Sequence, residues 1–452
     1  MAREGTEGIE LLKRYYEKNG SQLVIVYGQK HAKIMKQVRA FADGKTSAFY
    51  RARSCSEREQ LFIWGKECGE KGAGLPEYPQ YTELFAFLTE QQTGKAVIII
   101  EEFQHFVKQS GDFIPSLLRF LHCSRQPVIA VLCSTAVGWI ENSMVCKIGQ
   151  AACGIAGFIK IKEQRFFELV RAFPGSTRQE QIETYAVLGG FPGLWDHFEK
   201  GLPPRENICR YLLHDGAFLH EEALRLVAGE LRETGVYHTI LAALATGRQK
   251  LNDLFRHTGF SRAKISVYLK NLMELEIVEK VFSYDTEGRE NAQKGVYRIR
   301  NHFVAFYFHY LYPHLSRLDE MSPEDFYDCY IAPDFRSYVT PFFRQVCQEY
   351  MEYLNDRRKL PFFCTRMGEW VGKAGTIDLI AQDDSGHTIV CLCGWEKPVM
   401  PYEDYEWLLF CTRKARLQAD YVYLFSAVRF DGALQREAQQ NGSLRLISLD
   451  SF

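Results

Sequence analysis

The stretch VIVYGQKHAKIMKQV, residues 24–38, decides the fold class of the first part of the chain. It begins as an apolar strand, turns at Gly28 and continues with the apolar spacing of a helix. Three more short apolar runs follow, with amphipathic stretches between them: KTSAFYRA (45–52), KAVIIIEEF (95–103) and PVIAVLCST (127–135). Continuous apolar runs are typical of parallel strands that are buried on both faces. The sequence therefore predicts an α/β domain with a parallel sheet and helices on both sides.

The composition is that of a globular protein with about two to four domains. The 452 residues are 46% hydrophobic and 25% charged, with a net charge of −1. No apolar run approaches the roughly 20 residues that span a bilayer, and the charged start MAREGTEGIELL lacks the core of a signal peptide, so we expect a cytoplasmic protein. The 13 scattered cysteines include no CxxC pair, which favours free thiols. Because the net charge is near zero, nucleic-acid binding would need a local basic patch.

The layout of strand, glycine and helix is that of a phosphate-binding loop, in which backbone N–H groups at a helix N-terminus hold phosphate oxygens. Counted from Gly28, the pattern G-x-x-x-x-G-K-[ST] falls on Lys33, Ile34 and Met35. Lys33 replaces the second glycine, Ile34 the phosphate-binding lysine, and Met35 the hydroxyl that holds Mg²⁺. Lys30 and Lys33 are nearby positive charges, but neither takes the place of that lysine. Taken alone, the segment favours a plain strand–turn–helix.

Polar residues end two of the other predicted strands. Glu101 and Glu102 follow the run KAVIII, and Ser134 with Thr135 ends the run PVIAVLC. In P-loop ATPases an acid at such a strand end holds Mg²⁺ through water, and a following Glu polarises the attacking water. Ser134 and Thr135 lie where such folds place a polar sensor of the γ-phosphate. A solvated acidic pair after a buried strand is the competing interpretation. The order and spacing of the three strand ends are together more specific than any one of them.

Four stretches resemble the archaeal-type ATPases of the AAA/STAND class: REGTEGIELLKRYYEKNGSQLVIVYG (3–28), VIIIEEFQHF (97–106), YAVLGGFPGLW (185–195) and GFSRAKISVYLKNLMELEIVEK (259–280). Members of that family join a P-loop ATPase to a winged helix and a C-terminal nuclease-like domain. The resemblance covers nearly the whole chain. It implies four regions: an ATPase core (1–160), a helical lid (161–228), a winged helix-turn-helix (229–300) and an α/β domain like a restriction endonuclease (301–452).

The resemblance also assigns roles to residues. Glu102 matches the family's catalytic glutamate, and Glu101 stands where the family has the aspartate that holds Mg²⁺. The family's nucleotide-sensing turn is intact at Gly190-Phe191-Pro192. ATP and Mg²⁺ are the implied cofactors, and the implied nucleotide-binding positions are Gly28, Lys30, Lys33, Glu101, Ser134, Gly190 and Pro192. The departures at residues 33–35 predict an eroded loop and no ATP hydrolysis, with Glu102 as a vestige.

Residues 229–300 have the pattern of a winged helix-turn-helix. The segment HTGFS supplies Gly259 for the turn and Ser261 as the N-cap of a second helix, which would begin near Arg262 and face a major groove. Against one acid, Asp253, the segment 248–270 holds six basic residues: Arg248, Lys250, Arg256, Arg262, Lys264 and Lys270. This excess of positive charge favours double-stranded DNA as the partner, and a protein-interaction module or spacer is the alternative.

The C-terminal region has lost most of the acids that a nuclease needs. The resemblance places Arg344 at the first acid, Thr376 at the second, and Leu392 and Gly394 at the final Glu and Lys; Asp378 alone survives. A lone Asp does not hold a catalytic divalent metal, so we expect no nuclease activity. We expect the aromatic run FVAFYFHYLY (303–312) to be core and domain-packing surface, with a base-stacking platform as the alternative.

Two separate catalytic sets are therefore degraded while the scaffold motifs remain. This predicts a protein that binds DNA or a protein partner without turnover. One alternative is an unusual ATPase that uses Lys30 or Lys33 with Glu101 and Glu102, with Glu101 as the Mg²⁺ ligand. A second alternative is a purely structural interaction module.

Overall fold

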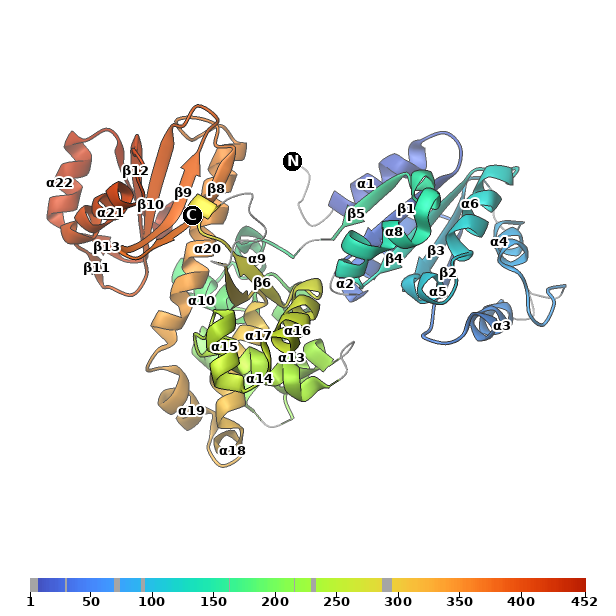
Figure 1. Cartoon of the computed structure of the whole chain (residues 1–452), viewed down its shortest axis with the longest axis horizontal. Coiled ribbons are helices and arrows are strands. Elements are labelled where there is room, and N and C mark those ends of the chain that lie inside the picture. The colour runs from blue at the N-terminus through green and yellow to red at the C-terminus, as the bar shows by residue number, and fades with distance from the viewer. Residues whose placement is uncertain are drawn as a thin grey trace. The chain divides into compact units, whose positions relative to one another are not determined.

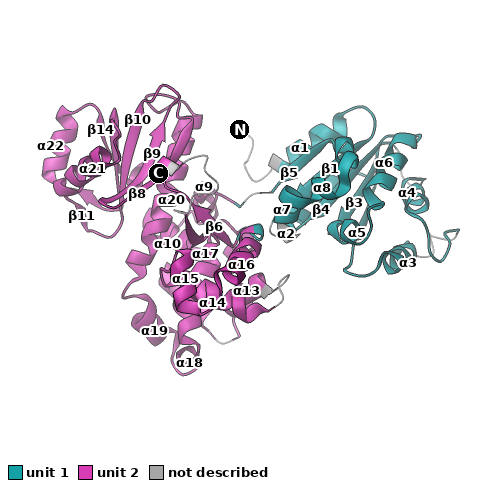
Figure 2. Cartoon of the chain, viewed as in Figure 1, with its two compact units in different colours: residues 1–163, 274–276 teal, residues 164–273, 277–452 magenta. Residues whose placement is uncertain are grey.

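The chain folds into two compact units, residues 1–163 with 274–276 and residues 164–273 with 277–452 (Figure 2). The computed structural model describes residues 7–28, 31–68, 74–90, 94–161, 163–214, 216–228, 233–286 and 295–452. Each unit has its own hydrophobic core.

The first unit contains a five-stranded sheet in the order β2-β3-β4-β1-β5 (Figure 1). All of its neighbouring strands are parallel. The strands are β1 (Gln22–Tyr27), β2 (Ser47–Arg51), β3 (Ala96–Glu101), β4 (Val128–Ser134) and β5 (Gly157–Lys160). The α/β fold with a parallel sheet, which the apolar runs predicted, is confirmed.

Helices cover both faces of this sheet. The helices and helical turns are α1 (Glu7–Glu17), α2 (His31–Ala42), α3 (Glu57–Glu67), α4 (Tyr81–Glu90), α5 (Gln104–Gln109), α6 (Phe113–Cys123), α7 (Val137–Trp139), η3 (Ile140–Met144), α8 (Val145–Ile148) and η4 (Gly149–Gly154). Because side chains alternate along a strand, Leu23 and Ile25 of β1 pack with α3 to α6, and Val24 and Val26 pack with α1 and α2. Both faces of β1 are buried.

The second unit begins with helices in the region predicted as the lid. They are α9 (Phe166–Ala172), α10 (Arg178–Leu188), α11 (Pro192–Trp195), α12 (Pro204–Ile208), η5 (Cys209–Leu213) and α13 (Phe218–Ala228). Buried Glu349, in the long helix α20 (Phe335–Asp356), accepts hydrogen bonds from the Phe166 N–H at 2.7 Å and the Tyr185 hydroxyl at 2.9 Å. These bonds tie α9 and α10 to α20.

The winged helix-turn-helix forms as predicted. Its elements are α14 (Thr234–Ala245), α15 (Leu251–Thr258), α16 (Arg262–Glu274), β6 (Val278–Val281), η6 (Tyr284–Thr286) and β7 (Val296–Ile299), with β6 and β7 antiparallel. Gly259 ends α15 with φ +72°, a conformation that favours glycine. The Ser261 hydroxyl accepts a hydrogen bond from the Lys264 N–H at 3.2 Å and so caps α16. The predicted turn and N-cap are both confirmed.

The last part of the second unit holds a mixed sheet in the order β14-β12-β10-β9-β8. Strands β8, β9 and β10 are antiparallel, and β10, β12 and β14 are parallel. The strands and helices, besides α20, are α17 (His302–Phe306), η7 (Tyr307–Leu311), η8 (Tyr312–His314), α18 (Leu315–Leu318), α19 (Pro323–Phe326), η9 (Tyr327–Ile331), β8 (Arg366–Gly372), β9 (Gly375–Gln382), β10 (Thr388–Gly394), β11 (Val399–Met400), α21 (Tyr402–Lys414), β12 (Tyr421–Ser426), β13 (Arg429–Phe430), α22 (Gly432–Gln440), β14 (Leu444–Ser448) and η10 (Leu449–Ser451). Phe303, Phe306 and Phe308 are fully buried, so the aromatic run is core, as predicted.

The winged helix packs against the edge strand β8. The Ser283 hydroxyl accepts a hydrogen bond from the Val371 N–H at 3.0 Å, and the guanidinium of Arg366 lies 3.6 Å from the centre of the Tyr284 ring. The Tyr284 hydroxyl donates to Gln382 Oε1 at 2.9 Å. Edge strands expose unpaired backbone groups, and here part of that edge is covered by the segment that follows β6.

Candidate functional site

Three of the predicted nucleotide-binding residues lie at the carboxyl ends of the strands of the first sheet. Glu101 ends β3, Ser134 ends β4, and Gly28 directly follows β1. The carboxyl ends of adjacent parallel strands meet at the same edge, and the Gly28 N–H donates to the Ser134 carbonyl at 3.2 Å. A Cβ on Gly28 would lie 2.6 Å from the Ile161 carbonyl oxygen, so backbone packing by itself requires a glycine there.

Glu101, the acid that the resemblance assigns to Mg²⁺, lies beside the guanidinium of Arg39. The Glu101 side chain is 6% exposed, and its Oε1 atom lies 3.7 Å from Nη2 of Arg39 in α2. Arg39 is a site residue that sequence reasoning missed, because it lies in a different element far from Glu101 in the chain.

Glu102 is held by hydrogen bonds within the protein. Its Oε2 atom accepts from the Thr135 hydroxyl at 2.8 Å and from the Gln104 side-chain amide. Glu102 has φ +54°, a conformation unusual for a residue with a side chain. Glu102 and Thr135 directly follow the neighbouring strands β3 and β4, and their side chains are in contact. Gln104 was missed, although its position two residues after Glu102 was the available signal.

The two positions that define a phosphate loop lie in the hydrophobic core. Ile34 and Met35 are 1% and 4% exposed and belong to the cluster that includes Leu12, Val24 and Phe41. Helix α2 begins at His31, so both residues belong to its first turns. Lys30 and the side chain of Lys33 lie outside the described residues. The described residues at this edge do not fit ATP and Mg²⁺, since neither a lysine nor a hydroxyl stands where the loop needs them.

The predicted nucleotide-sensing turn lies in the second unit and has a packing role there. The Gly190 carbonyl accepts from the Gln164 N–H at 2.8 Å, and a Cβ on Gly190 would lie 2.1 Å from the Gln164 carbonyl oxygen. The Trp195 indole donates to the Gly189 carbonyl at 2.8 Å, and Pro192 begins α11. Close backbone approach therefore explains the glycine without a nucleotide.

The predicted DNA-binding residues gather on α15, the turn and α16. Lys250, Arg256 and Lys270 are exposed. Arg262 Nε donates to Asn252 Oδ1 at 2.9 Å, and its guanidinium lies 4.1 Å from the centre of the Phe255 ring. Lys264 Nζ lies 3.7 Å from Glu233 Oε2, so part of its charge is balanced.

One face of α16 is buried and the other is exposed. Ile265, Leu269 and Leu272 are fully buried and fix the helix in the module. The exposed positions are Arg262, Ala263, Ser266, Val267 and Lys270. Val267 is 57% exposed, and sequence reasoning had not singled it out. The exposed face thus combines two cations with small and apolar side chains, a mixture that suits phosphates and base edges in a major groove.

The predicted vestige of the nuclease site is an ion pair. Asp378 of β9 has a side chain that is 2% exposed, and its Oδ1 atom lies 2.9 Å from Nε of Arg344. Its Oδ2 atom accepts from the Cys393 N–H at 2.8 Å. Burial raises the pKa of Asp378, while Arg344 and the Cys393 N–H lower it. Arg344 and Asp378, two positions that the resemblance had assigned to the acids of a nuclease, are therefore direct partners.

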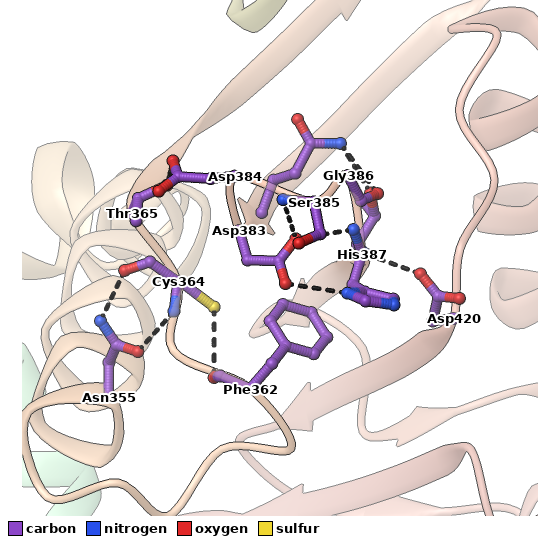
Figure 3. A network of polar contacts seen from close by, with 12 residues as sticks. Asn355, Phe362, Cys364, Thr365, Asp383, Asp384, Ser385, Gly386, His387 and Asp420 are labelled. Carbon is purple, nitrogen blue, oxygen red and sulfur yellow. Dashed lines mark hydrogen bonds and ion pairs between the residues drawn. The ribbon is translucent and has the colours of Figure 1, made fainter.

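A second polar network lies at the turn between β9 and β10 (Figure 3). Asp383 accepts from His387 Nδ1 at 2.8 Å and from the N–H groups of Ser385 and His387 at 2.9 and 2.8 Å. Asp420 accepts from the Thr388 N–H at 2.8 Å. The hydrogen bond to Asp383 raises the pKa of His387. A hollow of about 490 Å³ lies beside this turn. Because the named contacts satisfy the backbone of the turn itself, we assign the network a structural role.

Within the described ranges, no three His, Cys, Asp or Glu side chains gather in the manner of a metal site. Over the same residues, no helix has the length and apolar character to span a membrane.

Two parts of the chain match known families. Residues 307–405 match a family described as archaea bacterial proteins of unknown function, and residues 239–280 match the bacterial regulatory protein, arsR family. An uncharacterized protein of Methanocaldococcus jannaschii is 24% identical over 462 residues, which cover 99% of this chain and 98% of that protein. These matches cover the winged helix and part of the C-terminal region, and the similarity to the archaeal relative extends over nearly the whole chain.

Several solved structures are similar at low identity. The ORC2 protein of Aeropyrum pernix, in ADPNP-ADP complexes, aligns with a TM-score of 0.42 and 14% identity over 70% of this chain and 93% of that chain. The ORC1 protein of the same organism, in complex with DNA, aligns with a TM-score of 0.32 and 14% identity over 70% and 93%. A RuvB mutant of Thermotoga maritima aligns with a TM-score of 0.31 and 13% identity over 64% and 88%.

Proposed function

We propose that the protein binds double-stranded DNA through its winged helix and does not hydrolyse ATP. The observation that carries the DNA proposal is the exposed face of α16, where Arg262 and Lys270 flank Ala263, Ser266 and Val267. The capped start of α16 at Ser261 adds backbone N–H groups that favour a phosphate. The match of residues 239–280 to a family of regulatory proteins agrees with this assignment.

The test of DNA binding uses the full chain and a labelled duplex at several salt concentrations. Replacing Arg262 and Lys270 together by Ala removes two phosphate contacts, so the salt slope should fall by roughly 1.8, at about 0.9 per contact. Arg413→Gln, on the exposed surface of α21, is the control that removes one cation outside the winged helix. If the wild-type protein fails to bind the duplex at low salt, the DNA proposal is wrong.

The loss of ATP hydrolysis rests on the burial of Ile34 and Met35. The lysine and hydroxyl that they replace make charge-assisted contacts worth about 1.5–3 kcal/mol each, so their loss weakens nucleotide binding by several orders of magnitude. Calorimetry should therefore detect no Mg-ATP binding in the micromolar range. ATPase measurements should give the same background rate for the wild type and for Glu102→Gln. Micromolar binding with turnover that disappears in Glu102→Gln would instead favour the unusual ATPase.

A further inference from the structure

The pair Arg344–Asp378 fixes an arginine on the surface of the C-terminal sheet. Asp378 has both oxygens engaged, one beside Arg344 Nε at 2.9 Å and the other with the Cys393 N–H at 2.8 Å. Because the carboxylate is buried, its charge keeps the Arg344 side chain beside it as an ion pair, and Arg344 Nε forms no hydrogen bond within the described residues.

The neighbouring acid has an arginine of its own. Glu369 lies at an irregularity in the pairing of β8 with β9, and Arg298 of β7 donates to its two oxygens at 3.0 and 2.7 Å. Such a bulge re-aims the side chain that it contains. Glu369 raises the pKa of Asp378, so the two carboxylates act on one another. A divalent metal would need these oxygens free, and here each carboxylate has a guanidinium instead. The residues present therefore do not fit a nuclease metal centre.

The outer edge of the Arg344 guanidinium remains available. Nε is the atom that faces Asp378, while the side chain as a whole is 39% exposed. Neither Nη atom forms a hydrogen bond or ion pair with any residue in the part of the chain that the structure describes. The Nη1–Nη2 edge of a guanidinium presents parallel N–H groups that match two oxygens of a phosphate.

We propose that Arg344 binds a backbone phosphate of the DNA that α16 binds, so that the Arg344–Asp378 pair positions nucleic acid. This inference rests on the proposed function. The contacts of Arg298 with Glu369 and of Ser283 with Val371 join the winged helix to the sheet that carries Asp378. Asp378 is a positioning residue, since it holds Arg344 and has no free oxygen for a metal.

The experiment measures fluorescence anisotropy of a labelled duplex with the full-length protein across a salt series. Arg344→Gln alone leaves Asp378 buried without its partner, so the informative variant combines Arg344→Gln with Asp378→Asn, and a thermal melt checks its folding. We expect this double variant to bind about ten-fold more weakly, with a salt slope lower by about 0.9. Asp378→Asn alone keeps the cation, so it should weaken binding while preserving the slope. Arg413→Gln is the control for the loss of one exposed arginine elsewhere on the same unit.

Three results would overturn the inference. A folded double variant with wild-type affinity and slope would remove Arg344 from the interface and leave the winged-helix proposal intact. A wild-type protein that binds no duplex would overturn both proposals. The third result comes from thermal melts with inorganic phosphate added at constant ionic strength. If it raises the melting temperature of the wild type more than that of the double variant while both bind DNA equally, Arg344 is a site for free phosphate.

Discussion

Ile34 occupies the position at which a phosphate loop requires lysine, and it is 1% exposed in the core. Restoring the lysine by Ile34→Lys would place a charge among Leu12, Val24 and Phe41. We expect this variant to lose at least about 2 kcal/mol of unfolding free energy and to gain no ATP binding. Urea denaturation and calorimetry measure the two effects, with Ile34→Val as the conservative control at roughly 1 kcal/mol. A stably folded Ile34→Lys variant that binds Mg-ATP would contradict this explanation of the eroded loop.

Glu349 titrates in an unusual range. Burial raises its pKa to about 7, against hydrogen bonds from Phe166 and Tyr185 that lower it, and the ordinary value is 4.5. The folded state therefore retains a proton that the unfolded chain releases between pH 4.5 and 7. The unfolding free energy should fall by about 3 kcal/mol as pH rises through this window.

Glu349→Gln should remove that pH dependence, since an amide does not titrate. Urea midpoints between pH 4.5 and 8, compared between wild type and variant, measure the difference. The variant should also be less stable at pH 5, because one of the two donors, Phe166 N–H or the Tyr185 hydroxyl, loses its acceptor. Parallel stability curves for the two proteins would show that Glu349 is already ionised in the folded state.

The sequence predicted which positions lack the residue types that the motifs require. It did not predict which contacts the side chains at those positions make. Ile34, Met35 and Arg344 are departures from motifs and are visible in the chain itself. The ion pairs of Arg39 with Glu101 and of Arg344 with Asp378 join residues far apart in the sequence. Which acid an arginine meets depends on how a helix crosses a sheet, and one sequence does not contain that information.

At the scale of elements, the start of α16 can be tested by its cap. Ser261→Ala should cost about 1 kcal/mol of stability, because the Lys264 N–H loses its acceptor. Ser261→Asp keeps an acceptor, so it should retain stability, yet its charge should repel DNA phosphates and weaken binding. Thermal unfolding and duplex titration separate the two effects. Equal DNA affinity in Ser261→Asp and the wild type would place the start of α16 away from the DNA backbone.

The strands of the first sheet could be predicted because each is a continuous apolar run that is buried on both faces. Strand β8 could not be predicted, because its sequence RMGEWVG is rich in weak strand formers. These are Gly368, Glu369 and Gly372. It forms because β9 offers a hairpin partner and the winged helix covers part of its outer edge. Tertiary contacts, and not local preference, make this element.

For the whole molecule, the two compact units should unfold separately. Each has its own core, and Glu349 ties α9, α10 and α20 together within the second unit. Differential scanning calorimetry should resolve two transitions, of which Glu349→Gln shifts only one. A single transition whose calorimetric and van't Hoff enthalpies agree would show that the chain unfolds as one cooperative body.

The covered edge of β8 also determines how the chain can be divided. Ser283 and Tyr284, which contact Val371, Arg366 and Gln382, are lost from any fragment that begins at residue 301. That fragment would present the outer N–H and C=O groups of β8 beside Val371, a side chain that is 48% exposed even with the winged helix in place. Such an edge is a template for adding strands from other molecules. Expressed alone, residues 301–452 should aggregate, whereas a fragment that begins at residue 164 keeps the edge covered and should remain monomeric.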